Sequence, residues 1–191
     1  MTRKSLLTSI AVAAALVGVG AATALSLDDD HGRRHPKRRF KAELRGFEEV
    51  PAVSTLAHGK LELRINRNED EIAWRLEYQD LQGNVTQSHI HIGDHHTTGG
   101  ISVWFCFNPP IVPPATIPVP QACPAAPQGG PAVVLTGSFH AGDVAGPNAQ
   151  LVAPGDFAEL IRAIRSGVAY GNVHSSLVPG GEIRGELKVD E

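Results

Sequence analysis

The chain has 191 residues, with 17 Lys and Arg against 20 Asp and Glu and a formal net charge of −3. This acidic balance argues against nucleic-acid binding, which relies on clustered positive charge. The length suits a single domain with a sizeable core.

The first 24 residues have the three parts of a secretory signal peptide. Arg3 and Lys4 give a positive start, an apolar run covers residues 6–20, and residues 22–24 form an A-x-A cleavage site. Cleavage after Ala24 takes the net charge from −3 to about −5 and predicts a secreted or periplasmic protein without a stable membrane span. The alternative is an uncleaved anchor, although a run rich in Ala, Val and Gly makes a weak one.

Residues 25–39 are expected to form a disordered, charged arm, because they contain almost nothing to bury. A solvated, flexible segment is the favoured interpretation of its cations, and a surface-binding patch is the alternative. The cations are Arg33, Arg34, Lys37, Arg38 and Arg39.

From residue 40 onward, short segments alternate polar and apolar residues in the manner of half-buried strands. Residues 60–65 and 72–78 do so, with polar turn residues between them, and predict a hairpin. Further strands are expected at 40–46, 86–92, 100–107, 133–140, 168–175 and 182–189. Eight such strands predict an all-β domain over residues 40–189, an antiparallel Greek-key-like β-sandwich.

One helix is predicted near residues 156–166. Phe157, Leu160, Ile161 and Ile164 share one helical face, and Gly167 follows the end of the segment. Residues 108–131 are too long and too rich in proline for a simple turn, so we interpret them as a surface insertion.

The two cysteines, Cys106 and Cys123, predict a disulfide that ties down this insertion, because an exported chain with an even cysteine count favours one. The rival interpretation is a pair of thiolate metal ligands. The sequence has no C-x-x-C spacing to support it.

Three histidines form a candidate metal site. His89 and His91 lie two apart in a predicted strand and so share a face, and His174 lies in a second predicted strand. If the two strands are neighbours, three imidazoles can bind one ion of copper, zinc, iron or nickel. The alternative is two surface histidines and one that is buried and hydrogen-bonded.

Residues 40–187 resemble the CHRD domain, the module named after chordin. The matching segments, in the order in which the family has them, are residues 47–51, 88–93, 170–174 and 179–187. The resemblance implies an extracellular module. In chordin such domains belong to a protein that binds growth factors, so a metal-free protein-binding or adhesion module is a competing function.

A looser similarity links shorter motifs to copper-zinc superoxide dismutases. It rests on the H-x-H pair, the following Gly93-Asp94, the later His174 and Arg184. The zinc-loop pattern of spaced histidines is missing, so the similarity implies a copper-only site, with zinc less favoured. In a dismutase, Arg184 would guide the superoxide anion to the metal. The favoured interpretation of Glu182 and Arg184, which share a face of the last predicted strand, is structural: an ion pair or a hydrogen-bond anchor.

The other histidines and two acidic residues have weaker assignments. His95 and His96 form either a solvated loop tip or a source of a fourth ligand, and Glu48 and Glu49 are candidates to orient a histidine. The remaining histidines are expected outside the site: His31, His35, His58 and His140.

Other chemistry has little support in the sequence. It contains no G-x-S-x-G, phosphate-binding loop or H-E-x-x-H motif, and its one sequon, at Asn84, matters only in a eukaryotic source. We therefore expect an exported CHRD-type protein that binds copper through His89, His91 and His174.

Overall fold

The computed structural model describes residues 36–190, which contain ten strands and one α-helix. The predicted signal peptide and residues 25–35 of the predicted arm lie outside the described residues. Within residues 36–190, the α-helix is too short to cross a membrane.

The strands follow the predicted ones closely. In chain order the elements are β1 (Arg39–Arg45), β2 (His58–Ile65), β3 (Ile72–Gln79), β4 (Val85–Ile92), β5 (Gly100–Phe107), β6 (Gln121–Ala122), β7 (Val133–Phe139), α1 (Phe157–Ser166), β8 (Ala169–Ser175), β9 (Ile183–Glu186) and β10 (Lys188–Val189). Only the two-residue β6 was unexpected, and the strand predicted at 182–189 is divided into β9 and β10.

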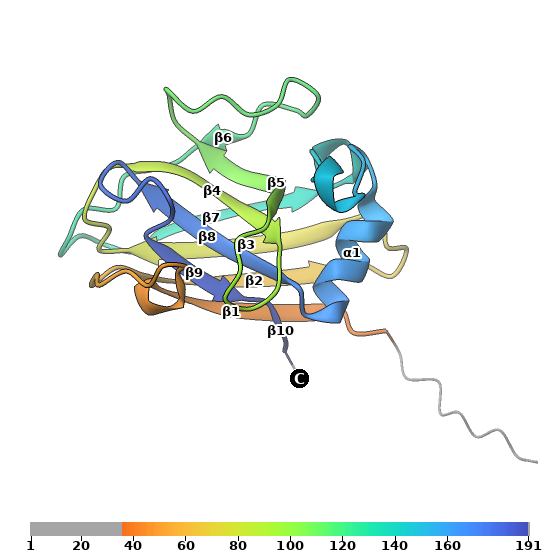
Figure 1. Ribbon diagram of the computed structural model, residues 1–191, viewed down its shortest axis with the longest axis horizontal. Coiled ribbons are helices and arrows are strands. Elements are labelled where there is room, and N and C mark those ends of the chain that lie inside the picture. Colours follow the sequence, from red (N-terminus) through yellow and green to blue (C-terminus); the bar gives the residue numbers. More distant parts are fainter. Residues whose placement is uncertain (1–35, 191) are drawn as a thin grey trace, which may run out of the picture. The chain divides into compact units, whose positions relative to one another are not determined.

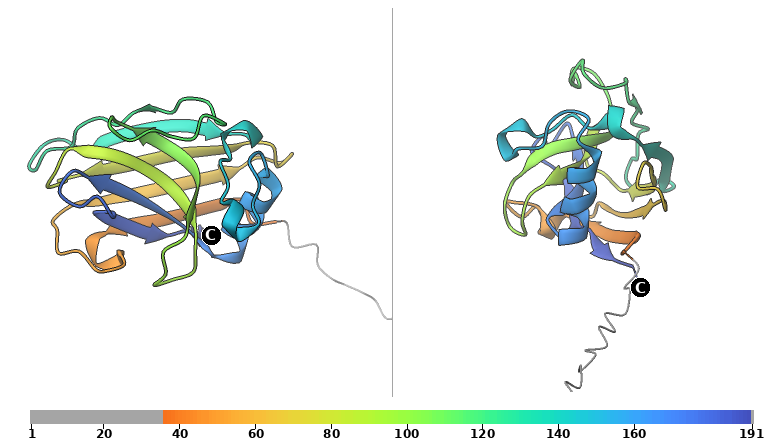
Figure 2. Two further views of the ribbon diagram at one scale, coloured as in Figure 1. Left: turned by 45° about the horizontal axis from the view of Figure 1, so that its top comes forward. Right: turned by 90° about the vertical axis from the view of Figure 1, so that its right-hand side faces the viewer.

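All ten strands belong to one hydrogen-bonded sheet in the order β6-β5-β4-β8-β9-β1-β2-β3-β7, with β10 paired to β1. The pairs are antiparallel except β5 with β6. The sheet curls into a half-barrel (Figures 1 and 2), so that its two halves face each other across the core. Trp74 on β3 accordingly meets Phe105 on β5, with ring centroids 4.9 Å apart. The all-β fold with one short helix is confirmed.

Alternation of apolar and polar residues decides which face of each strand enters the core. In β1, Phe40, Ala42 and Leu44 are buried while their neighbours are exposed. The helix α1 buries its predicted apolar face and ends at Gly167, whose φ of 73° allows its N–H to cap the last turn. It stands across one end of the curled sheet (Figure 2).

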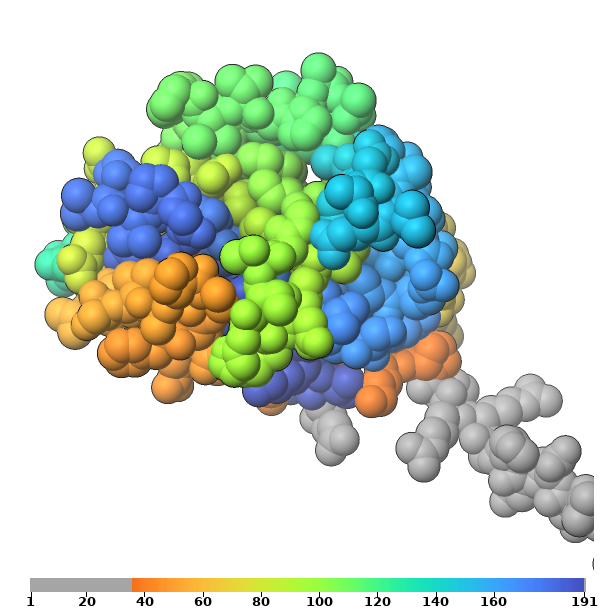
Figure 3. Space-filling model, in the orientation of Figure 1, coloured from red at the N-terminus to blue at the C-terminus, as the bar shows by residue number. Residues whose placement is uncertain are grey.

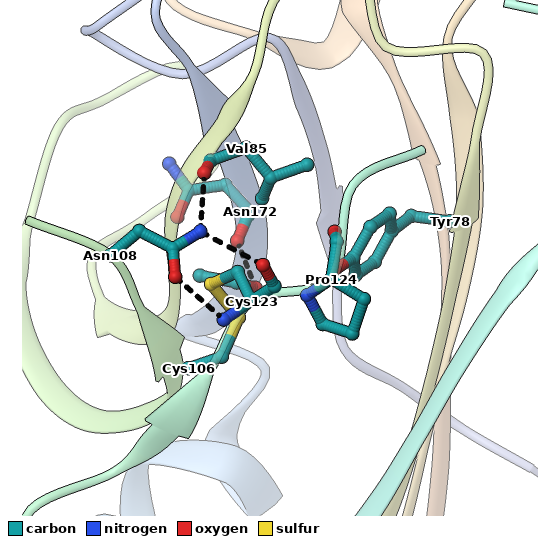
Figure 4. The surroundings of a disulfide bond; sticks show 8 residues. Tyr78, Val85, Cys106, Asn108, Cys123, Pro124 and Asn172 are labelled. Carbon is teal, nitrogen blue, oxygen red and sulfur yellow. Dashed lines mark hydrogen bonds between the residues drawn. A yellow bond between two sulfur atoms is a disulfide. The ribbon is translucent and has the colours of Figure 1, made fainter. Parts of the chain in front are cut away.

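The predicted disulfide joins Cys106 on β5 to Cys123, just after β6. Asn108 reinforces it, because its side-chain amide donates to the carbonyl oxygens of Val85 and Cys123 and accepts from the Cys123 N–H (Figure 4). The Tyr78 hydroxyl donates to the Pro124 carbonyl 2.9 Å away. The proline-rich insertion is therefore fixed to β3, β4 and β5 at its second half.

Replacing both cysteines with alanine is expected to lower the free energy of unfolding by about 3 kcal/mol, because the bridge closes a loop of about 17 residues. Urea unfolding measures this loss. Hydrogen exchange should accelerate mainly in residues 108–122, and equal acceleration in β4 and β8 would contradict a local role for the bridge.

Candidate metal centre

Two neighbouring strands carry the three candidate ligands. His89 and His91 lie on β4 and His174 on β8, and these strands pair in antiparallel register with His89 opposite Asn172 and His91 opposite Tyr170. Because alternate residues of a strand share a face, the three imidazoles gather on one side of the sheet. Their nearest ring nitrogens all lie within 4.8 Å of one another. The structure thus brings together the three histidines expected from the sequence.

This cluster lies on the outer face of the sheet, because Ile90 and Val173, which alternate with the histidines, belong to the core. Three connections cover it: residues 46–57, 93–99 and 176–182. Figure 3 shows the three segments side by side on the face where Figure 1 shows β8 and β9. This cover leaves His89 fully buried and His91 and His174 more than nine-tenths buried.

Backbone carbonyls fix two of the rings. His91 Nδ1 lies 2.8 Å from the Gly99 carbonyl oxygen, and His174 Nδ1 lies 2.8 Å from that of Pro179. A carbonyl oxygen only accepts, so each Nδ1 carries the hydrogen and each Nε2 keeps its lone pair. Neither Nε2 has a hydrogen-bond partner among the described residues, and neither nitrogen of His89 has one. Buried polar atoms are seldom left in this state, and a metal ion would satisfy them.

The site also keeps the imidazoles uncharged. Burial, with smaller contributions from neighbouring histidines, lowers the pKa of His89 well below 6.5 and that of His91 to about 4. Burial lowers the pKa of His174 as well. Neutral imidazole is the form that binds a metal, so no proton has to leave these rings at neutral pH.

Aromatic rings pack around the cluster. Tyr170 stacks on His91 with ring centroids 4.8 Å apart and planes 8° apart. Trp104, opposite His89 on β5, lies 4.7 Å from the His89 ring. The Tyr170 hydroxyl accepts a hydrogen bond from the Gly99 N–H, so the same connection that holds His91 is also held by Tyr170.

Arg184 lies behind Tyr170 and is almost fully buried. Its guanidinium carbon is 3.4 Å from the Tyr170 ring centroid, a cation–π contact, and it pairs with Glu186 at 2.6 Å. It also donates to the Thr97 carbonyl oxygen at 2.7 Å. These contacts hold residues 93–99 over the site, which makes Arg184 a positioning residue in this geometry. Its role as an anion guide stays a prediction.

Glu182 does not form the ion pair with Arg184 that the sequence suggested, but it is a hydrogen-bond anchor, the other form of the structural interpretation. It precedes β9 and accepts hydrogen bonds from the Thr55 hydroxyl and the Gln82 N–H, both at 2.8 Å. The true partner, Glu186, lies two residues after Arg184 on the same strand face. The alternating pattern alone could not distinguish between the two glutamates.

Glu49 is a buried acidic residue near the site. It is 7% exposed, and one carboxylate oxygen has no partner among the described residues. The carboxylate packs against Gly181, where a Cβ would lie 2.3 Å from that oxygen. Burial raises the pKa of Glu49 to about 7, although Arg184 opposes the shift. Glu48 beside it is exposed, although the two residues have the same candidate role in the sequence pattern.

The remaining histidines of the described chain lie outside the cluster. His95 and His96 lie at an exposed loop tip, with ring centroids 3.7 Å apart and planes tilted by 46°, which fits the solvated alternative. His58 and His140 are exposed and bond to backbone carbonyls. Within residues 36–190, His89, His91 and His174 form the one cluster with metal-ligand spacing. His31 and His35 lie outside the described residues.

Comparison with known proteins identifies the family. The CHRD domain model matches residues 40–187, which include the three histidines, Glu49 and Arg184. The chain belongs to the CHRD domain family. No curated protein and no solved structure matches it. The CHRD match supports the first resemblance seen in the sequence, whereas the similarity to superoxide dismutases has no support from these comparisons.

The buried Glu49 makes a pH dependence testable in the metal-free CHRD protein. Between pH about 4.5 and 7 the folded protein keeps a proton on Glu49 that the unfolded chain releases, so the contribution of Glu49 to stability falls as pH rises. The loss is at most about 3 kcal/mol. The lowered pKa values of the three buried histidines contribute in the opposite direction. In urea unfolding, the stability of Glu49→Gln relative to Glu48→Gln should increase between pH 5 and 7.5, because only Glu49→Gln removes the Glu49 contribution while both variants keep that of the histidines. An unchanged pH dependence in Glu49→Gln would contradict the assignment.

Proposed function

We propose that this protein is an exported metal-binding protein that holds one transition-metal ion, copper first, through Nε2 of His89, His91 and His174. The observation that carries the proposal is a set of three buried, uncharged imidazoles. Each offers a ring nitrogen within 4.8 Å of the others, and each has an unpartnered Nε2. Imidazole–metal bonds are about 2.0–2.1 Å long, so small rotations of the rings would bring the three nitrogens onto one ion.

Copper is preferred over other metals for two chemical reasons. First, imidazole binds zinc, iron and nickel as well, but among first-row divalent ions nitrogen ligands bind Cu²⁺ most tightly. Second, the donor set found here contains three imidazoles and no thiolate, because both cysteines form the disulfide. Zinc is the next candidate, since three histidines with one open position also suit that ion.

Three features of the chain support export: a predicted signal peptide, a disulfide and membership of the CHRD family. The sequence begins with a predicted signal peptide, and the disulfide suits an oxidising compartment such as the periplasm or the extracellular space. CHRD domains are typically extracellular, and the chain belongs to that family.

The covered site favours holding copper over rapid turnover. A dismutase needs access for a small anion and a positive charge that steers it. Here three connections cover the histidines, and Arg184 is buried and paired with Glu186. Copper storage or delivery therefore fits these contacts better than superoxide chemistry, which remains the alternative if the loaded protein turns over superoxide.

Copper titration of the metal-free protein tests the proposal directly. We expect one tight site in the wild type and a loss of affinity of at least about 100-fold when His89, His91 and His174 are all changed to alanine. His58→Ala/His140→Ala is the matched control, because these exposed histidines have the same chemistry outside the cluster. If the triple variant bound copper as tightly as the wild type, the metal centre would be elsewhere.

A further inference from the structure

A second feature lies on the outer face of β1, β2 and β3, where charged side chains form cross-strand rows. In two successive rows each neighbour carries the opposite charge. These rows are Glu43, Lys60 and Glu77, followed by Lys41, Glu62 and Arg75. Opposite charges placed directly across from each other stabilise a sheet, so this part of the surface is complementary within itself.

The next row breaks the pattern. Arg39 on β1 lies directly opposite Arg64 on β2, and the neighbour of Arg64 on β3 is the uncharged Ala73. Like charges in directly opposed positions destabilise a sheet. An acidic residue at either arginine position would continue the complementary rows. Like-charged pairs also occur on the other side of β1, where Lys41 lies opposite Lys188 and Arg45 lies opposite Arg184. The pairing alone therefore does not indicate binding, which is indicated instead by the hollow that Arg39 and Arg64 line.

The arginines surround a hollow in the surface. Arg38, Arg39, Arg64 and Arg67 line a pocket of about 420 Å³ with Ile65 and Asn66, and none of these described lining residues is acidic. We call these four side chains the arginine pocket. A second hollow of about 350 Å³ adjoins it and shares Arg39 and Arg64.

Two carboxylates act on these arginines, but each already binds another cation. The ion pair of Glu69 with Arg165, at 2.7 Å, lowers the pKa of Glu69, and the charge of Arg38 adds a smaller share. The ion pair of Asp190 with Lys41, at 2.6 Å, likewise lowers the pKa of Asp190, and the charge of Arg39 adds a smaller share. The excess of positive charge is therefore local, in a chain whose acidic residues outnumber its basic ones. Such a local excess attracts anions that the whole molecule would repel.

We propose that the arginine pocket binds a linear polymer that carries repeated phosphate or sulfate groups. The guanidinium fork matches the oxygens of these groups and binds them through paired hydrogen bonds. Four arginines around one open hollow suit several anionic groups in succession better than one isolated ion. The pocket lies on β1 and β2 and the metal centre on β4 and β8, so this binding does not depend on copper.

Binding of the full mature protein to fluorescent polyphosphate and to heparin tests the proposal. At low salt, Arg39→Gln/Arg64→Gln should weaken binding to the preferred polymer by about tenfold or more and reduce its salt dependence. The matched control, Arg45→Gln/Lys60→Gln, removes the same charge from the same face, leaves the pairing of Asp190 with Lys41 intact and should weaken binding by less than about twofold. Preference for heparin or polyphosphate assigns the sulfate or the phosphate source.

Thermal unfolding at low salt guards against a folding artefact. Arg64→Gln should unfold at the same or a higher temperature than the wild type, whereas Lys60→Gln should unfold at a lower one, because only the second breaks a complementary row.

Three results would overturn the proposal: no binding of wild type to either polymer, equal losses in the two double variants, or tighter arginine-dependent binding to anionic lipid vesicles than to both polymers.

Discussion

The antiparallel register between β4 and β8 is the constraint on which the metal centre depends. It places Asn172 opposite His89 and Tyr170 opposite His91, and so puts the ring of His174 on the same face as the other two. Because side chains alternate across a strand, a slip of β8 by one residue would turn His174 inward and Val173 outward, and a slip of β4 would do the same to its two histidines and Ile90. Burial of those apolar residues therefore fixes the histidine geometry as firmly as it fixes the core.

The cover over this face determines the chemistry of the site. Gly99 and Pro179 belong to covering connections, and their carbonyls hold His91 and His174 with Nε2 free. Arg184 holds residues 93–99 in place through its hydrogen bond to Thr97. The Tyr170 ring lies between the positive charge of Arg184 and the His91 ring. The same cover removes water from the rings and keeps them neutral. A site assembled in this way is prepared for a cation before any metal arrives, which is consistent with copper binding.

Local periodicity made much of this structure predictable from sequence. Alternation located the strands, the 3.6-residue period located α1, and the H-x-H spacing placed His89 and His91 on one face. The disulfide followed from cysteine count and export. The prediction that His174 joins His89 and His91 required β4 and β8 to be neighbours, and nothing in the residue spacing shows which strands are neighbours.

Features that depend on tertiary contacts were missed or misassigned. Glu49 lies in the segment after a short helical turn, outside any alternating pattern, and its burial depends on Gly181 from a distant connection. Trp104 meets His89 through a bulged pairing of β4 with β5, and a bulge shifts which residues share a face. The possible ion pair of Arg184 with Glu182 rested on their shared alternation, whereas the strand begins only at Ile183 and Glu186 is the partner of Arg184.

The most direct test of the central claim is the coordination of copper in the loaded wild-type protein. Pulsed electron paramagnetic resonance, with X-ray absorption on the same sample, counts the imidazoles and measures their distances. This account predicts three histidine nitrogens at about 2.0–2.1 Å from one copper ion, with one imidazole fewer in His174→Ala. Coordination by one or no imidazole, or a spectrum unchanged in His174→Ala, would contradict it.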